Sequence, residues 1–371
     1  MKQSQFPLVF REHVPLAPYT TLGIGGPARF FAEAGAETHV MEALEFARAR
    51  SLPSFILGGG SNIVVSDAGF DGLVIRIALL GIRRKRSGMV TAAAGEEWDQ
   101  FVRWCVEHDL AGIECLSGIP GSVGGTPVQN VGAYGQEVGE VIHAVRVLDR
   151  GRQKVVELSN EQCGFSYRTS VFNTTRPKGF VVLAVSYGLR PGGAPRIVYP
   201  DLSRHFAERS DPPGLIEVRD AVLNVRKSKS MVLRPDDPNS KSVGSFFKNP
   251  FVSSATALQA EEAARHRGTL KRDEVMPRYP MPDGTVKLSA AWLIEHAGFV
   301  KGYSRGCVGL SSRHALALIN RGGATAEALL DLMRDIQETV RSRFDVELTP
   351  EPVFVGFTKP LPKAISVEER S

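Results

Sequence analysis

Apolar residues near the start of the chain recur at two spacings, which together predict a small α/β unit over about the first 80 residues. Val40, Leu44 and Ala47 lie three or four positions apart, the spacing of one helix face. Ser54–Leu57 is a short apolar run of the kind that forms a buried strand, and Gly72–Ile77 is a second one. We therefore expect a helix and two strands here.

The middle of the chain predicts one amphipathic helix followed by strands, up to about residue 225. Trp98–Glu107 places Phe101, Val102, Cys105 and Val106 on one side of a helix. The β-rich segments that follow are Val141–Leu148, Lys154–Leu158 and Phe180–Gly188. Because these strands do not alternate with helices, the pattern is typical of an α+β fold.

The composition changes around residues 228–240, where Lys, Ser, Pro and Asp predict a loop and a domain junction. Beyond it, the patterns predict a helix near Leu288–Ala297, a strand at Ala315–Ile319 and a closing strand at Pro352–Phe357. A longer helix is expected over Thr325–Phe344. Its apolar stripe, which predicts core packing rather than cofactor contact, is Leu329, Met333, Ile336, Val340 and Phe344.

Length and composition predict a folded protein with several domains. The 371 residues are 43% hydrophobic, and about 150 residues per domain gives two or three domains. A charged fraction of 23% is ordinary and excludes wholesale disorder. The net charge of +5 fits an anionic small substrate as well as a polyanion. The basic run Arg83–Arg86 is interpreted as a solvated turn, with nucleic-acid contact as the alternative.

The cysteine pattern and the apolar runs predict a soluble, cytoplasmic protein. None of the four cysteines has CxxC spacing or a metal-ligand pattern, so free thiols in a reducing compartment are expected. No HExxH motif or acidic cluster indicates a metal. Met1–Pro7 lacks the apolar core of a signal peptide, and no run reaches the ~18 apolar residues of a membrane span.

Two glycine-rich runs, Leu57–Asn62 and Ser117–Thr126, predict a cofactor site. Neither contains a Lys or Arg, so peptide N–H groups rather than side chains would hold a pyrophosphate there. Glycine also permits close approach of the backbone. Two tight turns remain the alternative. The P-loop and G-x-G-x-x-G patterns are absent, so a dinucleotide would be held outside a Rossmann motif.

Three polar residues are candidates for chemistry. Ser245 lies between a glycine and two phenylalanines, where a hydroxyl could donate a proton away from bulk water; a turn residue is the alternative. Arg168 lies in a segment expected to be partly buried, and a substrate carboxylate or a structural ion pair could be its acceptor. Glu351 lies between two prolines where a helix-to-strand connection ends. The neighbouring sequence alone gives little evidence that this glutamate has a chemical role.

In these motifs the chain resembles the UDP-N-acetylenolpyruvoylglucosamine reductases, flavin enzymes that make UDP-N-acetylmuramate for peptidoglycan. The resemblance extends over nearly the whole chain, in the order of the family's motifs. The matching segments are Thr20–Gly23, Leu57–Asn62, Gly118–Gly125, Gln129–Gly135, Tyr167–Arg168, Gly244–Pro250, Lys287–Ile294 and Pro350–Glu351.

The resemblance implies an α+β fold of three parts. Residues 1–80 and 81–227 would form a two-lobed FAD-binding fold of the vanillyl-alcohol-oxidase type, with residues 354–371 returning to the first part. Residues 228–353 would form a third α+β domain that binds the UDP-sugar. Non-covalent FAD is expected, because no histidine lies in the glycine-loop region. The implied FAD-binding residues are Gly58, Gly59, Gly60, Ser61, Asn62, Ser117, Gly118, Ile119, Pro120, Gly121, Ser122, Gly124 and Gly125.

The resemblance also implies the reaction. NADPH would reduce FAD, and hydride would pass from flavin N5 to the enolpyruvyl double bond of UDP-N-acetylglucosamine enolpyruvate. Ser245 would protonate the substrate carbon, while Arg168 and Glu351 would polarise the carboxylate and stabilise the enolate. Glu351 could be protonated, or could act through Ser245 or a water.

The segment Ile197–Leu202 resembles the lid loop of the larger family variant, which makes Tyr199 the candidate lid residue. Proline at position 200 departs from the glycine that is usual there. A solvated loop is the alternative for Arg226 and Lys229, and no role is carried to His314. The implied substrate-binding residues are Tyr134, Tyr199, Arg226, Lys229, Lys248 and Asn249.

Two rival functions stay open at this stage. One is a flavin oxidase of the same fold that acts on alcohols or sugars, which would leave the Ser245 motif unexplained. The other is a nucleic-acid-binding protein built around Arg83–Arg86, whose binding would weaken steeply with salt. The favoured reading expects a monomer that uses NADPH and the UDP-sugar, with no metal, nucleic-acid or membrane partner.

Overall fold

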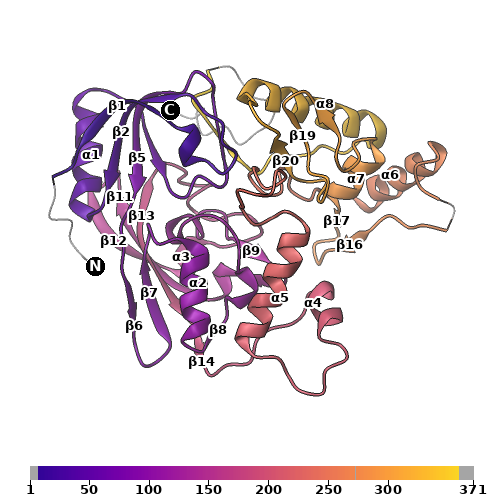
Figure 1. Ribbon diagram of the computed structural model, residues 1–371, viewed down its shortest axis with the longest axis horizontal. Helices are drawn as coiled ribbons and strands as arrows, with labels where there is room; N and C mark the ends of the chain where they lie inside the picture. The colour runs from indigo at the N-terminus through magenta and orange to yellow at the C-terminus, as the bar shows by residue number, and fades with distance from the viewer. Residues whose placement is uncertain (1–6, 272, 359–371) are drawn as a thin grey trace. The chain divides into compact units, whose positions relative to one another are not determined.

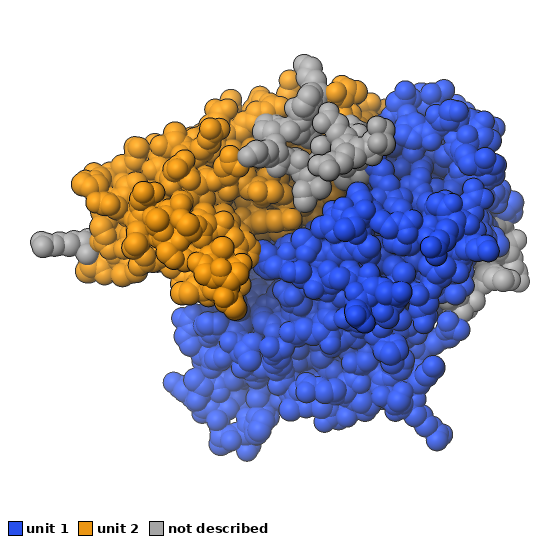
Figure 2. Space-filling view, turned by 180° about the vertical axis from the view of Figure 1, so that it is seen from behind, with its two compact units in different colours: residues 1–14, 28–60, 70–232 blue, residues 15–27, 61–69, 233–371 orange. Residues whose placement is uncertain are grey.

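The computed structural model describes residues 7–271 and 273–358 and separates into two compact units. Unit 1 comprises the described parts of residues 1–14, 28–60 and 70–232, and unit 2 those of residues 15–27, 61–69 and 233–371 (Figure 2). The finer division at residues 80 and 227 stays a prediction. The predicted return of residues 354–371 falls largely on residues 359–371, which lie outside the described part, as do residues 1–6 of the N-terminal segment.

The first sheet of unit 1 has four strands in the order β1-β2-β5-β3 (Figure 1). They are β1 (Phe10–Pro15), β2 (Pro27–Ala34), β5 (Phe70–Ile77) and β3 (Ser54–Leu57). Both β2 and β3 run parallel to β5. Parallel strands need a crossover connection, and helix α1 (Glu37–Ala49) provides it between β2 and β3, which lie on either side of β5. The expected helix and both expected strands are therefore present.

The second sheet of unit 1 is antiparallel, with the order β12-β11-β13-β7-β6. Its strands are β12 (Lys154–Ser159), β11 (Ile142–Asp149), β13 (Phe180–Gly188), β7 (Met89–Ala93) and β6 (Ile82–Arg84). The three segments predicted as β-rich are the first three of these strands. In the basic run Arg83–Arg86, the first two arginines lie on the edge strand β6 rather than in a turn. All four residues of the run are exposed.

Helix α2 has the bounds that its amphipathic pattern predicts, Trp98–Glu107. Its apolar side packs on the second sheet, where the rings of Trp98 and Phe101 lie 6.0 and 5.1 Å from the ring of Tyr187 on β13. The buried face contains the four residues that the sequence places there. Burial of this stripe is the main reason that so short a helix is stable.

A second helix, α5 (Leu215–Ser228), lies beside α2 and was not predicted from the sequence (Figure 1). The short helix α4 (Pro200–His205) packs on α5. The remaining elements of unit 1 are α3 (Asn160–Cys163), the pairs β8 (Leu110–Ala111) with β14 (Arg190–Pro191) and β9 (Gly132–Ala133) with β10 (Gln136–Glu137), and the 3-10 turns Glu114–Leu116, Val123–Gly125 and Val138–Glu140.

Unit 2 contains three small sheets. Two are antiparallel, with the orders β15-β17-β16 and β18-β19-β20, and in the third β21 runs parallel to β4. The strands are β15 (Phe251–Val252), β17 (Val286–Leu288), β16 (Arg278–Pro280), β18 (Ser304–Arg305), β19 (Val308–Leu310), β20 (Leu318–Asn320), β21 (Val353–Val355) and β4 (Ile63–Val65). Strand β20 begins later than predicted because the N–H of Ala317 closes a turn onto the carbonyl of His314.

Three helices complete unit 2, together with the 3-10 turn Ala17–Tyr19: α6 (Ser254–His266), α7 (Ala290–His296) and α8 (Ala326–Phe344). The predicted apolar stripe of α8 is buried throughout. Its N-terminus is capped twice, because the Thr325 side chain accepts the N–H of Ala328 and the Asp67 carboxylate accepts the N–H groups of Ala326 and Glu327. Between residues 7 and 358 as described, no helix is both long and apolar enough to cross a membrane.

Candidate functional site

The two glycine-rich runs meet in unit 1 with backbone against backbone. A Cβ atom added to Gly59 would lie 2.5 Å from the Cα of Gly121, and one added to Gly58 would lie 2.8 Å from the Ser122 Oγ. Such distances leave no room for any side chain at Gly59. The sequence predicted two bare-backbone loops, and the structure brings them into contact.

Hydrogen-bond donors are available at this junction. Within the described residues, the N–H groups of Gly59 and Gly60 donate to no other residue, and the buried Ser122 Oγ has no hydrogen-bond partner. A buried hydroxyl without a partner costs free energy unless a ligand satisfies it. Peptide N–H groups and a hydroxyl form a donor set that suits a pyrophosphate.

Other N–H groups of the second run hold the protein together instead. Gly124 donates to the carbonyl of Ala94 at 2.9 Å, and Gly125 donates to the carbonyl of Ser122 at 2.9 Å. Ser117 is fully buried, and its Oγ donates to the carbonyl of Glu114 at 2.7 Å. These predicted FAD residues can therefore shape the loop, and any cofactor contact they make depends on close approach rather than on N–H donation.

The second run is anchored by an ion pair that the sequence did not reveal. Asp99 on α2 accepts the N–H of Gly118 at 2.5 Å and two hydrogen bonds from the Arg219 guanidinium on α5, at 2.6 and 2.8 Å. Burial raises the pKa of the Asp99 carboxyl, but Arg219 and the Gly118 N–H outweigh this effect and hold the pKa below its ordinary value. The two residues lie 120 positions apart, so no local pattern could connect them.

Arg168 is half-buried in unit 1, and its guanidinium is held by backbone carbonyl groups. It donates to the carbonyl of Gly132 at 2.9 Å and to that of Asn130 at 3.4 Å. Arg168 itself has a left-handed backbone with φ of 55°, and Asn130 and Tyr134 have φ of 45° and 50°. Left-handed non-glycine residues are uncommon and often cluster at functional sites.

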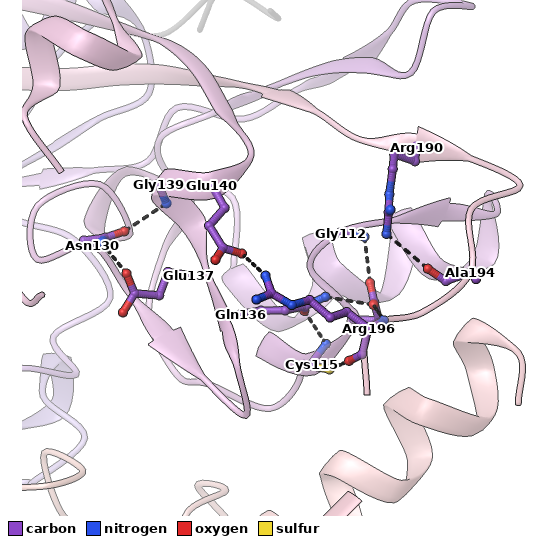
Figure 3. Close-up of polar contacts among 11 residues, drawn as sticks. Gly112, Cys115, Asn130, Gln136, Glu137, Gly139, Glu140, Arg190, Ala194 and Arg196 are labelled. Carbon is purple, nitrogen blue, oxygen red and sulfur yellow. Dashed lines mark hydrogen bonds and ion pairs between the residues drawn. The ribbon is translucent and has the colours of Figure 1, made fainter. Parts of the chain in front are cut away.

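The loop that carries Asn130 is fixed by side-chain hydrogen bonds (Figure 3). The Asn130 amide donates to the Glu137 carboxylate at 2.8 Å, and its oxygen accepts the N–H of Gly139 at 2.9 Å. Nearby, the fully buried Glu114 accepts N–H donors from Gly112 and Gln136, at 2.7 and 2.8 Å. This network fixes the carbonyl groups that position Arg168.

Ser245 and Glu351 lie on two paired segments of unit 2. Phe247 and Pro350 form an antiparallel bridge, and the N–H of Glu351 donates to the carbonyl of Phe246 at 2.9 Å. Phe246 and Phe247 are buried, and Ser245 is half-buried beside them. Among the described residues, the Ser245 hydroxyl has no hydrogen-bond partner. The backbone segments that carry Ser245 and Glu351 are therefore adjacent, and the roles of the two side chains remain predictions.

The predicted lid residue begins a helix in unit 1. Tyr199 is the N-cap of α4, and its ring lies edge-on to that of Tyr134 with centroids 5.1 Å apart. Pro200 is the first residue of this helix, where its fixed φ is favourable, which explains the departure from glycine. The Lys229 ammonium lies 6.0 Å from the centre of the Tyr134 ring and makes an ion pair with Asp201 at 2.9 Å.

Arg226 is buried on α5, so the solvated-loop alternative is wrong for this residue. Its guanidinium donates to the carbonyl of Met231 at 2.6 Å, while its buried Nε has no partner among the described residues. Burial lowers the pKa of Arg226. A Cβ at Gly118 would lie 3.3 Å from this Nε, so Arg226 lies beneath the second glycine run.

The other two predicted substrate residues lie in unit 2. The Asn249 side-chain oxygen accepts the N–H of Ala290 at 3.0 Å and so supports the start of α7. Lys248 is half-buried, and its backbone N–H donates to the carbonyl of Thr349 at 3.0 Å. No group of three or more metal-ligating side chains occurs among the residues that the structure describes.

Comparisons with known proteins agree with this geometry. The family model described as UDP-N-acetylenolpyruvoylglucosamine reductase, C-terminal domain, matches residues 236–355, and that of an FAD binding domain matches residues 28–159. The reductase of Thermobifida fusca is 45% identical over 364 residues, which cover 94% of this chain and 99% of the relative. The reductase of Saccharopolyspora erythraea is 46% identical over 348 residues, covering 92% and 94% of the two chains.

The chain belongs to the UDP-N-acetylenolpyruvoylglucosamine reductase family. A solved structure agrees with this assignment. The reductase from Thermus caldophilus has a TM-score of 0.65 and 27% identity, and the match covers 94% of this chain and 100% of that one. The expected α+β fold with an FAD-binding part is confirmed, and so is an FAD-containing oxidoreductase that uses NADPH.

The residues at the loop junction fit FAD. The backbones of Gly59 and Gly121 lie in contact with no side chain between the two loops, and Ser122 supplies an unused buried hydroxyl. We would assign FAD to this junction on those observations, since a dinucleotide needs close backbone approach and directed N–H groups. The individual contacts of the predicted FAD residues remain predictions.

Proposed function

We propose that Arg168, Ser245 and Glu351 carry out the NADPH-dependent reduction of UDP-N-acetylglucosamine enolpyruvate to UDP-N-acetylmuramate in peptidoglycan synthesis. The similarity to curated reductases along nearly the whole chain is the observation that carries this function. Bound FAD, once reduced by NADPH, supplies the hydride. The residues of the chain hold the substrate, stabilise charge on it and deliver the proton.

Ser245 is proposed to donate the proton to the substrate carbon. Its neighbours Phe246 and Phe247 are buried, so its hydroxyl lies where bulk water has limited access. A serine hydroxyl is a weak acid and needs a second group that restores its proton. Glu351 supplies that group directly or through a water, because its backbone is hydrogen-bonded to Phe246, the residue next to Ser245.

Arg168 is proposed to bind the carboxylate of the enolpyruvyl group. Addition of hydride to this double bond leaves negative charge that the carboxylate can share, and a guanidinium stabilises that charge as it develops. The bonds to Gly132 and Asn130 fix the guanidinium before substrate arrives, which reduces the reorganisation needed in the reaction.

Tyr134, Tyr199, Arg226, Lys229, Lys248 and Asn249 are proposed to bind the UDP-sugar. Lys229 provides charge for the diphosphate, and Tyr199 covers the nucleotide sugar. The enzyme is proposed to act as a cytoplasmic monomer on these small molecules, with no nucleic-acid or membrane partner. Size-exclusion chromatography with light scattering tests the monomer.

An absorbance spectrum of the purified protein under anaerobic conditions tests the function. The flavin band should bleach when NADPH is added and return when UDP-N-acetylglucosamine enolpyruvate follows. A band that returns only with oxygen would favour a flavin oxidase instead. A colourless protein that cannot take up FAD would contradict the assignment, and salt-sensitive binding to nucleic acid would then support the other rival.

A further inference from the structure

The contacts of helix α4, which begins at the candidate lid residue Tyr199, include an apolar one and an ionic one to other elements of unit 1. Leu202 is fully buried in a cluster with Val218 and Val222 of α5. One residue earlier, the Asp201 carboxylate binds the Lys229 ammonium at 2.9 Å. Both contacts lie within the first turn of this six-residue helix.

Asp201 also binds a second cation, on the other side of the same carboxylate. Arg204, one turn further along α4, donates to it at 2.6 Å, but the Arg204 side chain is 77% exposed, against 35% for Lys229. An exposed pair within one helix contributes little to stability. The pair with Lys229 is therefore the one that joins α4 to another element.

The lid tyrosine depends on the same helical turn. The carbonyl of Tyr199 accepts the N–H groups of Leu202 and Ser203, at 3.0 and 2.9 Å, so Tyr199 and Asp201 are held in one rigid turn. Across from them, Tyr134 contacts the ring of Tyr199 and lies beneath the ammonium of Lys229. Movement of Asp201 away from Lys229 would carry Tyr199 away from Tyr134.

We propose that Asp201 is a positioning residue that holds Tyr199 against Tyr134 through Lys229, so that one cation serves both the candidate lid and the substrate diphosphate. The proposal rests on the proposed function, in which Lys229 binds the diphosphate. A lysine ammonium has three N–H donors, so it can bind a carboxylate and a phosphate oxygen together. Burial lowers the pKa of Lys229, but Asp201 and Tyr134 outweigh burial and leave that pKa raised, which keeps the ammonium charged.

Calorimetric titration of the oxidised FAD-loaded protein with UDP-N-acetylglucosamine enolpyruvate, without NADPH, tests the proposal. The substitution Asp201→Asn keeps the size of the side chain and removes its charge. We expect the Kd to rise about fivefold, the scale of a partly exposed ion pair, with kcat changed less than about twofold. Asp201→Glu should recover part of the affinity. The matched control Arg204→Gln removes the other partner of the same carboxylate and should leave the Kd within about twofold.

The outcomes separate the inference from the proposed function. If Asp201→Asn binds the substrate as tightly as the unaltered protein, or more tightly, the positioning role is wrong. If Lys229→Met also binds normally, the assignment of the diphosphate to Lys229 fails as well. If Lys229→Met loses affinity and Asp201→Asn does not, only the inference fails.

Hydrogen exchange of the unaltered protein tests the proposal without any substitution, so the result cannot be affected by a variant that fails to fold. The amides of Leu202 and Ser203 report on the turn that holds Tyr199. Salt weakens a partly exposed ion pair, so these amides should exchange faster at high ionic strength, and substrate should slow them at low ionic strength. Exchange that is independent of both would overturn the proposal.

Discussion

The side-chain amide of Asn62 donates a hydrogen bond to the carbonyl of Glu351 at 3.3 Å, joining residues 289 positions apart. The carbonyl of Asn62 also accepts the N–H of Val353 at 2.9 Å. The last residue of the first glycine-rich run is therefore bonded to the segment Glu351–Val353 at two points. A loop expected only to bind FAD thus also holds the backbone of the candidate catalytic glutamate.

Substitution of Asn62 by Asp should impair catalysis more than substrate binding. The aspartate has the same size but cannot donate to the Glu351 carbonyl when ionised. We expect kcat to fall about fivefold to tenfold, the scale of one hydrogen bond of ~1 kcal/mol, with KM nearly unchanged. Steady-state kinetics measure this split. The control Asn239→Asp keeps the oxygen that accepts the Ser312 N–H, and an equal loss there would show that the effect is not specific.

Substitution of Ser245 by Ala should separate the two half-reactions. NADPH should still bleach the flavin, while turnover of the enolpyruvyl sugar should fall about 10²–10⁴-fold, as expected for loss of a general acid. Stopped-flow absorbance follows the two steps separately. Full turnover in this variant would exclude Ser245 as the proton donor. Ser253→Ala removes the cap of α6 and should lower Tm without changing kcat.

A side chain at Gly59 should prevent FAD from binding. In Gly59→Ala the added Cβ would overlap the backbone of Gly121, so the two runs must separate. We expect the purified variant to contain less than about a tenth of the flavin of the unaltered protein, a loss of at least one tenfold step in binding. The ratio of flavin to protein absorbance measures it. Gly188→Ala is the control, because a Cβ there meets its nearest atom at an ordinary 3.9 Å.

Loss of the Asp99 charge should destabilise unit 1 in a way that depends on pH. Asp99→Asn leaves the buried Arg219 without its carboxylate, which should cost ~3 kcal/mol in the free energy of unfolding at pH 7. Because the pKa of Asp99 is depressed in the folded protein, the stabilisation is complete above the ordinary value of 3.8 and is lost as pH falls through the folded value.

Urea unfolding of Asp99→Asn and of the unaltered protein measures this difference. The two free energies of unfolding should converge below pH 3.8 and stay apart above it. The control Asp71→Asn removes a carboxylate that is 86% exposed and should cost less than about 1 kcal/mol at any pH. A constant difference between Asp99→Asn and the unaltered protein from pH 3 upwards would contradict the pKa argument.

The four cysteines should differ in reactivity. Cys105, Cys115 and Cys163 are buried, and burial raises the pKa of Cys115 to about 12 and that of Cys163 to about 11. Cys307 is exposed. An aromatic disulfide reagent at pH 8 should therefore modify one thiol of the folded protein quickly and the other three only after unfolding. Rapid modification of two or more would show that a buried region opens in the native state.

The local sequence pattern predicted those helices and strands that bury a single face made of apolar residues. Helix α2 was predicted with its observed bounds because its five buried residues form one stripe. Helix α5 was not predicted, because the charged residues Arg219 and Arg226 lie on its buried side, where a stripe of apolar residues would have been expected. Arg219 is buried against Asp99, 120 positions away, and so distant a partner leaves no trace in local spacing, whereas Arg226 donates to the carbonyl of Met231 just beyond the helix.

For the same reason, the sequence indicated some candidate residues of the site but not the contacts between them. The glycine-rich runs, Ser245 and Arg168 were identified because their residue types are unusual for their surroundings. The approach of Gly59 to Gly121, the anchoring of Gly118 by Asp99 and the pairing of Asp201 with Lys229 appear only once the chain is folded. An acidic residue two positions after the predicted lid tyrosine was the only available signal for Asp201.

The parallel pairing of β4 with β21 affects how the protein folds during its synthesis on the ribosome. A ribosome releases β4 some 290 residues before its partner, which at about 5–20 residues per second is roughly 15–60 s of synthesis. Leu22 and Val64, buried in the finished unit 2, have no complete core to enter during that interval. Strand β21, the last of the described strands, thus completes a sheet whose other strand was synthesised near the start of the chain.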